Sequence, residues 1–205
     1  MISSDQFVSS LKGRLAHTYG KENESDKLVG GTIYIDESSE FITVQNQVSL
    51  GAAETLKGKH RMERDALRHG INIRGYRCDN SVYKSKEFID DTHNLRQTIQ
   101  FSGIGAHHHN DIAECCICTI STSARTILLH AMIHWPEEVT LDLWPFAIDY
   151  AVYIWNKLPR SPSNLSPEEL YYSTKSNHEA LRNAKVWGCP TYVLDPRLQD
   201  GKKIP

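Results

Sequence analysis

"GTIYIDESSEFITVQNQV", residues 31–48, is the stretch that decides the fold. Residues with high β-propensity lie on both sides of the polar turn "DESSE" (36–40), which predicts two strands joined by a short connection. Before it, "ISSDQFV" (2–8) is expected as a shorter strand, followed by a polar linker over 11–31. The chain is therefore expected to begin with three strands.

Helical and strand patterns alternate after this point. Apolar residues at helical spacing predict a helix over 52–70 that Gly70 ends, and "INIRGYRC" (71–78) predicts the next strand. The remaining patterns predict a helix over 85–96, a strand over 98–102, helices over 112–134 and 143–158, a Pro/Ser-rich connection over 159–170 with a helix start at "SPEE", and a last strand over 186–195. Mixed strands followed by helices indicate an α/β protein whose helices cover one sheet.

Composition limits the class of protein. The chain has 205 residues, 40% of them hydrophobic and 23% charged, as expected of one globular domain. No run of 18 apolar residues predicts a membrane span, and the N-terminus lacks the pattern of a secretory signal. The five cysteines form an odd, clustered set, which favours a reducing, intracellular compartment over a disulfide framework. A net charge of −2 argues against nucleic acid as the partner.

Three acids stand out by their local setting. Asp5 lies inside the first expected strand, Asp79 ends the strand over 71–78, and Glu114 lies in the first turn of the helix over 112–134. Acids at strand ends, joined by one from a nearby helix, can hold Mg²⁺, which prefers oxygen ligands. Two such ions can flank a phosphodiester during phosphoryl transfer. An Asp after a strand is also a common turn or cap residue, so the acids alone leave both readings open.

Several short sequence motifs occur in a specific order. They are "YRCDNSVYKSKEF", "QTIQFSGIGAHHHNDIAE", "TISTSARTILLHAMIHWPEE", "LWPFAIDYAVYIWNKLP" and "SPEEL". Together they closely resemble the integrase catalytic core of copia-type LTR retrotransposons, over nearly the whole chain. The resemblance implies an RNase H-like fold, here a five-stranded mixed sheet flanked by helices. It also implies DNA integration, by 3′-end processing and strand transfer, with element cDNA ends and target DNA as partners.

The resemblance assigns the three acids to a D…D…E triad that holds Mg²⁺ or Mn²⁺. Asp79 matches the second acid, and Glu114 follows it by the 35 positions that the family motif requires. Asp5 is the expected first acid, and Asp36, at the end of the second strand, is the rival. The expected DNA contacts are His107, His108, Asn110, Lys84, Lys86 and Arg125. The family also implies a homo-oligomer that works in the nucleus or in virus-like particles, with no membrane or small-molecule partner.

The chain departs from the family pattern close to these acids. Ser81 and Asp111 stand where the family has Gly, and Cys115 and Cys118 stand where it has basic residues. Cys118 shares the helical face of Glu114, so the loss of a basic side chain there removes a contact to DNA phosphate. We interpret the departures as those of a decayed element copy, and sibling copies that shared all four would contradict this.

Other interpretations of the same residues remain open. Cys115, Cys116 and Cys118 with His107–His109 could indicate zinc, but their spacing matches no standard site. The chain could also be a domesticated, non-catalytic RNase H-like domain that binds nucleic acid, or a nuclease unrelated to integration. The four tryptophans are expected in the core. Residues 1–175 are predicted to form the catalytic core, cut from a polyprotein, and residues 176–205 a C-terminal extension with a short strand.

Overall fold

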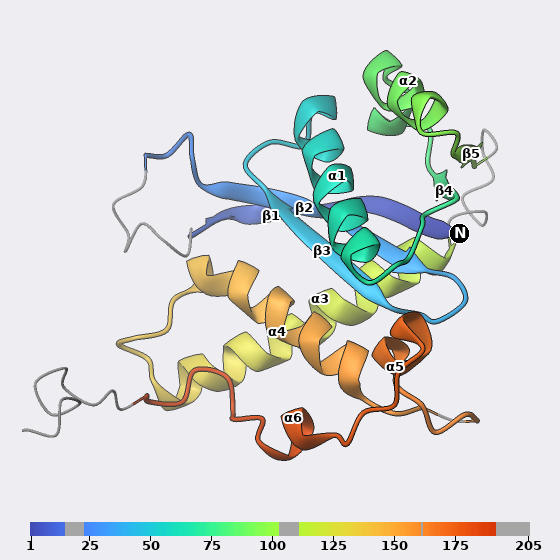
Figure 1. The fold of residues 1–205 in the computed structure, drawn as a ribbon. Helices are drawn as coiled ribbons and strands as arrows, with labels where there is room; N and C mark the ends of the chain where they lie inside the picture. Colours follow the sequence, from blue (N-terminus) through green and yellow to red (C-terminus); the bar gives the residue numbers. More distant parts are fainter. Residues whose placement is uncertain (15–22, 103–110, 161, 192–205) are drawn as a thin grey trace, which may run out of the picture.

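The computed structural model describes residues 1–14, 23–102, 111–160 and 162–191. The elements are, in chain order, β1 (Ile2–Gly13), β2 (Leu28–Asp36), β3 (Ile42–Gln47), α1 (Ala52–Arg68), β4 (Gly75–Cys78), the 3-10 turn η1 (Val82–Lys84), α2 (Lys86–Asn94), β5 (Thr98–Phe101), α3 (Asp111–His134), the 3-10 turn η3 (Leu141–Leu143), α4 (Trp144–Lys157), α5 (Pro167–Tyr172) and α6 (Glu179–Arg182). Figure 1 shows their arrangement.

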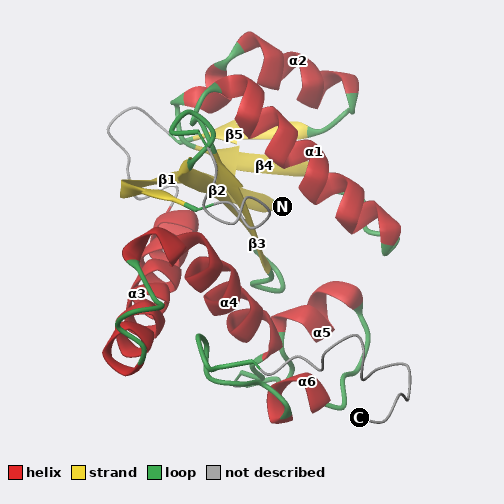
Figure 2. Ribbon diagram, turned by 90° about the vertical axis from the view of Figure 1, so that its left-hand side faces the viewer, coloured by secondary structure: helices red, strands yellow, loops and turns green. Residues whose placement is uncertain are grey.

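One five-stranded sheet organises the described part of the chain, in the order β3-β2-β1-β4-β5. β1, β2 and β3 are antiparallel neighbours, whereas β4 and β5 run parallel to β1. Figure 2 shows α1 and α2 on one side of the sheet and α3 and α4 on the other. The predicted α/β class, with a mixed five-stranded sheet flanked by helices, is therefore confirmed.

Alternation along β2 separates two hydrophobic clusters, because successive side chains of a strand point to opposite faces. Ile33 and Ile35 belong to the cluster that α3 and α4 cover, together with Cys116 and Trp144. Tyr34 belongs to the cluster on the other face, under α1 and α2. Each face of the sheet thus buries its own core.

The predicted strands differ from the observed ones mainly in length. β1 continues to Gly13, well beyond the expected end at residue 8, and β4 begins only at Gly75. Gly70 has a φ of 75°, the left-handed conformation expected of a residue that follows a helix end. The loop between this glycine and Gly75 therefore takes up half of the strand expected over 71–78.

The strand expected over 186–195 is wrong for its described part. Residues 186–191 form a turn and an irregular segment, while residues 192–195 lie outside the described part of the chain. Gly188 adopts a φ of 80°, which is incompatible with an extended strand. The short helix α6 was not expected, and no pattern in "EALR" marks it beyond helix propensity.

The last elements pack beneath α4. A capping box starts α5, in which Ser166 Oγ accepts from Glu169 N at 3.2 Å and Glu169 Oε2 accepts from Ser166 N at 2.8 Å. Tyr171 of α5 stacks on Phe41, with ring centroids 4.3 Å apart, and so ties α5 to the turn between β2 and β3. The division into residues 1–175 and 176–205 stays a prediction.

α3 is long and apolar enough to cross a membrane by length and composition alone. Ala113, Cys116, Ile120, Ala124, Leu128 and Ala131 are nevertheless buried on one side of it. These positions recur at helical spacing and face the sheet and α4, as in a core helix of a domain. All four tryptophans join the same cluster, Trp144 buried and Trp135, Trp155 and Trp187 partly buried, as predicted.

Candidate active site

The pairing of β1 with β4 brings Asp5 and Asp79 together. Ile2, Ser3 and Ser4 pair in parallel with Tyr76, Arg77 and Cys78, so the next step of this register sets Asp5 opposite Asp79. Adjacent strands lie about 4.8 Å apart, and paired side chains share a face. On its other side Asp5 pairs with Ile33, whose side chain lies in the core beneath α3. The two acids therefore lie at the end of β4, on the face that α3 covers.

Glu114 reaches the same place from α3. Ala113, one residue before it, is fully buried against the sheet, while Glu114 itself is exposed. The charge of Glu114 contributes to the electrostatic environment of Asp5, as does that of Asp79. The structure thus brings the three predicted acids within electrostatic reach of one another, from β1, the end of β4 and the first turns of α3.

The Asp5 carboxyl lies in an environment that disfavours its charged form. Burial raises the pKa of its carboxyl from 3.8 to about 6, a hydrogen bond from Gln6 N opposes this rise, and repulsion by Asp79 and Glu114 adds to it. The Gln6 N–H donates to Asp5 Oδ1 at 2.7 Å. Burial also raises the pKa of the neighbouring Cys78 thiol, with further repulsion from Asp79 and Asp5. Negative charge is therefore concentrated around the end of β4.

Asp79 has a local partner that sequence reasoning missed. Asp79 Oδ1 accepts from the Ser81 hydroxyl at 2.7 Å and from Ser81 N at 3.1 Å. Ser81 has a φ of −79°, outside the left-handed region that favours glycine. The signal was available in the sequence, since a serine two residues after an aspartate commonly closes such a turn. Ser81 therefore already donates two hydrogen bonds to Asp79 Oδ1, an oxygen that a bound cation would contact.

Asn80 fastens the end of β4 to the end of β5. Its Nδ2 donates to Ser102 O at 2.6 Å, and Ser102 N donates to Cys78 O at 3.0 Å. These bonds fix the position at which the chain enters residues 103–110, which the structure does not describe. Asn80 is thus a positioning residue beside Asp79, and was not predicted as one.

Asp36, the rival first acid, has a structural role in the turn between β2 and β3. Its Oδ2 accepts from Ser39 N at 3.0 Å and from Ser39 Oγ at 2.8 Å, which closes the turn between β2 and β3. It pairs with Ile2 in the sheet, three positions from Asp5 along β1, or about 10 Å. This placement favours Asp5 as the partner of Asp79.

The expected DNA contacts fall into three groups. His107, His108 and Asn110 lie outside the described residues, as does the loop that carries them. Lys84 and Lys86 are exposed just after the end of β4, and Lys84 Nζ lies 5.5 Å from the centre of the Phe101 ring. Arg125 is exposed on the same face of α3 as Glu114, about 16 Å further along the helix.

The cysteines at the start of α3 are divided between core and surface. Cys116 is buried in the main hydrophobic cluster, and burial raises the pKa of its thiol to about 12. Cys115 and Cys118 are exposed, as expected of positions where the family has basic side chains. A thiol that is buried and protonated is a packing residue rather than a metal ligand. Cys116 therefore argues against a zinc site built from all three cysteines.

The three acids suit a hard divalent cation by their chemistry. They offer only oxygen donors, and no ion pair with a described residue neutralises any of them. As the side chains lie, however, no three His, Cys, Asp or Glu residues of the described part are close enough together to hold a metal ion. A bound cation would relieve the repulsion that acts on Asp5 and would have to draw the carboxylates together.

Solved integrase structures share this architecture. The HTLV-2 integrase catalytic core domain in complex with magnesium, in its trimeric form, has a TM-score of 0.54 and 17% identity, over 83% of this chain and 94% of that chain. Its dimeric form has a TM-score of 0.54 and 15% identity, over the same shares of the two chains. The simian T-cell lymphotropic virus intasome, in complex with PP2A regulatory subunit B56 gamma, has a TM-score of 0.59 and 12% identity, over 95% of this chain and 59% of that chain.

No protein-family profile matches the sequence. No curated protein sequence matches it either. At 12–17% identity the likeness shows the fold, which is the RNase H-like fold of integrase catalytic cores. The predicted fold class is confirmed in this respect, and the roles of the individual acids stay predictions.

Proposed function

We propose that this chain is the catalytic domain of a copia-type retrotransposon integrase that joins DNA ends by phosphoryl transfer. The observation that carries the proposal is the convergence of Asp5, Asp79 and Glu114 on one end of the sheet, in the fold of integrase cores. An acid at this place whose pKa is raised by burial and by two other carboxylates is typical of a site that works with a cation.

In this proposal Asp5, Asp79 and Glu114 hold Mg²⁺ or Mn²⁺, which neutralises charge on the scissile phosphodiester. The 3′-hydroxyl of the element DNA is the nucleophile in strand transfer, and water is the nucleophile in end processing. The protein contributes positioning and a concentrated charge rather than a covalent intermediate. Asn80 keeps Asp79 in place through its bond to Ser102 O at 2.6 Å.

The proposed partners are element cDNA ends and target DNA, bound by a homo-oligomer in the nucleus or in virus-like particles. The HTLV-2 core is described in dimeric and trimeric forms, and the simian virus protein within an intasome, which supports an assembly of this kind. Lys84 and Lys86 beside Asp79, and Arg125 on the Glu114 face of α3, are the described residues proposed to contact phosphate.

A Mn²⁺-dependent disintegration assay on a branched DNA substrate tests the activity of this core. The chain as given is compared with Glu114→Gln, with Asp36→Asn as the matched control, and with the double variant Cys115→Arg/Cys118→Arg. We expect activity in the native chain and in Asp36→Asn and none in Glu114→Gln. Activity only in the arginine variant would indicate that the native chain has an intact catalytic site but binds DNA too weakly, because the two arginines restore contacts to DNA phosphate.

A non-catalytic, domesticated nucleic-acid-binding domain is the second candidate. It is favoured by the Ser81 hydroxyl on Asp79 Oδ1, which competes with a cation, and by the exposed thiols at Cys115 and Cys118. Folded protein that is inactive in every variant of the disintegration assay, but still binds DNA, would select this candidate over integration.

A further inference from the structure

Two histidines near the end of α3 lie far from the candidate active site. His130 and His134 are four residues apart, so their side chains project from the same face of the helix. Their ring centroids are 4.5 Å apart, and the ring planes are tilted by 54°. Among the described residues this is the only contact between two imidazole rings. Figure 1 shows this end of α3 on the side of the molecule away from β4 and β5.

Both imidazoles are available to a ligand. Each residue is exposed, and neither ring forms a hydrogen bond or an ion pair with a described residue. Other histidines are engaged: His60 Nε2 lies 2.8 Å from Asp91 Oδ1, and His178 Nε2 lies 3.9 Å from a carboxylate oxygen of α5. A neutral imidazole nitrogen is the commonest metal ligand in proteins. The pair on α3 therefore offers two nitrogen donors that no other polar contact occupies.

The spacing of the two rings suits a single metal ion. An ion lies about 2 Å from a ligating histidine nitrogen, and hence about 3 Å from the centre of the ring. Rings whose centroids are 4.5 Å apart can therefore share an ion at an angle of about 90°, as adjacent ligands do in tetragonal and octahedral complexes. Exposed side chains change rotamer rapidly, so both rings can turn a nitrogen toward a common ion.

The donor atoms select the class of the ion. Imidazole nitrogen suits Cu²⁺, Ni²⁺ and Zn²⁺, whereas Mg²⁺ and Ca²⁺ prefer oxygen ligands. No third His, Cys, Asp or Glu of the described residues extends this pair into a larger group. Two protein ligands leave the other positions of the ion open to water or to an exchangeable ligand. The site thus differs in class from the carboxylates of the candidate active site.

We propose that His130 and His134 chelate one divalent transition-metal ion of the Cu²⁺, Ni²⁺ and Zn²⁺ class. The ion links two successive turns of α3 just before the helix gives way to a turn, in which Val139 N donates to Trp135 O at 3.0 Å. It therefore stabilises the end of α3 from which the chain leads to α4. Glu114 lies about 24 Å from His130 along the same helix, so the site does not depend on the three acids or on catalysis by them.

Titration with Cu²⁺ tests the proposal once competing ligands are removed. In the parent chain for this test, serine replaces Cys115, Cys118 and Cys189, and alanine replaces His107, His108 and His109. At pH 7.5 we expect one Cu²⁺ per chain and an electron paramagnetic resonance spectrum with two nitrogen ligands. The ion should also quench the fluorescence of Trp135, because the ring centroids of Trp135 and His134 are 5.7 Å apart.

His130→Ala and His134→Ala should each raise the Kd for Cu²⁺ at least tenfold, because one imidazole cannot form a chelate. The matched control is Leu129→His/His130→Ala, which keeps the number of histidines but places them five residues apart, on different faces of the helix. It should bind as weakly as His130→Ala. Unchanged binding in His130→Ala, or binding as tight as the parent's in the displaced pair, would overturn the proposal.

Two further variants separate this site from other ligands. His93→Ala removes an exposed histidine of α2, and Glu114→Gln alters the candidate active site. Both should bind Cu²⁺ with the Kd of the parent chain, whether or not the acids hold a cation. A tenfold weaker binding in Glu114→Gln would assign the ion to the acids and overturn the proposal.

The urea midpoint of unfolding adds a second readout, since the helix is what holds both rings on one face. Saturating Cu²⁺ should raise this midpoint in the parent chain and leave it unchanged in His134→Ala. A midpoint that responded equally in both chains, or in neither, would contradict a chelate that stabilises the end of α3.

Discussion

Asp5 is an acid that the fold makes difficult to ionise. Its pKa of about 6 lies above the ordinary value of 3.8, chiefly because of burial, so between these pH values the folded protein retains a proton that the unfolded chain has released. Folding is then linked to proton binding, and the contribution of Asp5 to stability falls as pH rises through this window. The ionised carboxylate is also the form that would bind a cation. Cation binding would therefore be favoured at higher pH, where the contribution of Asp5 to folding stability is lowest.

We expect Asp5→Asn to remove this pH dependence. Relative to the native chain, the variant should become progressively more stable between pH 4 and pH 7, because an amide has no charge to bury. The measurement is the free energy of unfolding in urea across this range. Glu137→Gln, in the exposed segment after α3, is the control. A stability difference that did not change with pH would contradict the electrostatic description of Asp5.

Ser81 gives a second prediction for a single residue. Its hydroxyl bonds to Asp79 Oδ1 at 2.7 Å, so Ser81→Ala should free this oxygen and lower the Kd for Mn²⁺ severalfold. Ser81→Gly should behave like Ser81→Ala, because both substitutions remove the hydroxyl that donates to Asp79 Oδ1. Mn²⁺ titration followed by electron paramagnetic resonance checks this. A gain in Ser81→Gly alone would mean that backbone freedom, and not the hydroxyl, is what the departure from the family changed.

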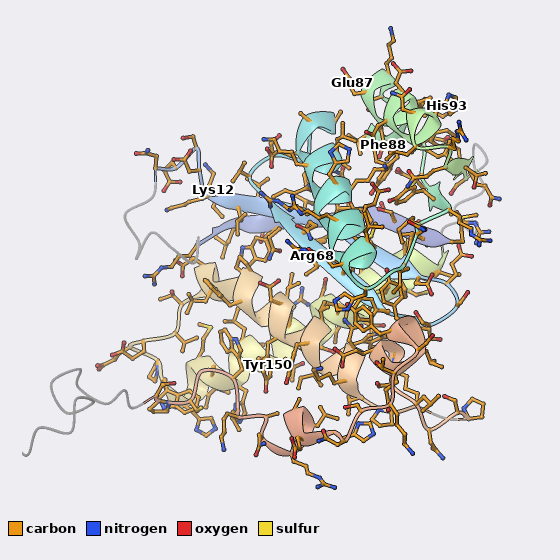
Figure 3. All side chains as sticks on the ribbon, viewed as in Figure 1. Lys12, Arg68, Glu87, Phe88, His93 and Tyr150 are labelled. Atoms are coloured by element: carbon orange, nitrogen blue, oxygen red, sulfur yellow. The ribbon has the colours of Figure 1, made fainter. Side chains whose placement is uncertain are left out.

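A buried ion network joins α1 to α2. The Lys59 side chain is fully buried in α1, and its Nζ lies 2.9 Å from Glu63 Oε1 and 2.6 Å from Asp91 Oδ2 of α2. Phe88 of α2 points toward α1, while Glu87 and His93 lie on its outer side (Figure 3). Burial opposes ionisation of Asp91, but hydrogen bonds and charge attraction from Lys59 and His60 together outweigh it and lower the pKa of Asp91. α2 is thereby held over β4, the strand that ends at Cys78, one residue before Asp79.

Lys59→Met should destabilise the fold by about 3 kcal/mol, since the loss of one partner leaves buried charge without compensation. The urea midpoint measures this loss. Lys57→Met is the matched control, because the Lys57 side chain is 64% exposed and its pair with Glu54 contributes at most about 0.5 kcal/mol. Equal effects of the two substitutions would mean that the network adds nothing to the docking of α2.

The helices and strands show how much of the fold could be read from the sequence. α1, α3 and α4 were predicted to within two residues at each end, because long apolar periodicity fixes a helix. The extra length of β1 was missed, since "SSLKG" has no strand pattern and is held by tertiary bonds such as Trp144 Nε1 to Leu11 O at 2.9 Å. The strand expected at 186 failed because Gly188 turns the chain there.

At the scale of the whole molecule, the sequence motif pointed to the three acids but did not show where they lie relative to one another in the fold. Asp5 and Asp79 meet only because β4 pairs in parallel with β1, and nothing local in either strand specifies that neighbour. The hydroxyl of Ser81 on Asp79 and the Asn80 bond to Ser102 O likewise depend on turns that a pattern does not reveal. With a net charge of −2, the proposed binding of DNA would have to rely on local basic residues rather than on bulk charge.

Binding of Mn²⁺, measured by electron paramagnetic resonance at pH 7.5, is the first experiment to make. The native chain and Asp36→Asn should bind Mn²⁺ saturably, and Asp5→Asn, Asp79→Asn and Glu114→Gln should each weaken that binding at least tenfold, because all three carboxylates act on one cation site. If Asp5→Asn bound Mn²⁺ as the native chain does, or Asp36→Asn did not bind it, then Asp5, Asp79 and Glu114 would not form the site.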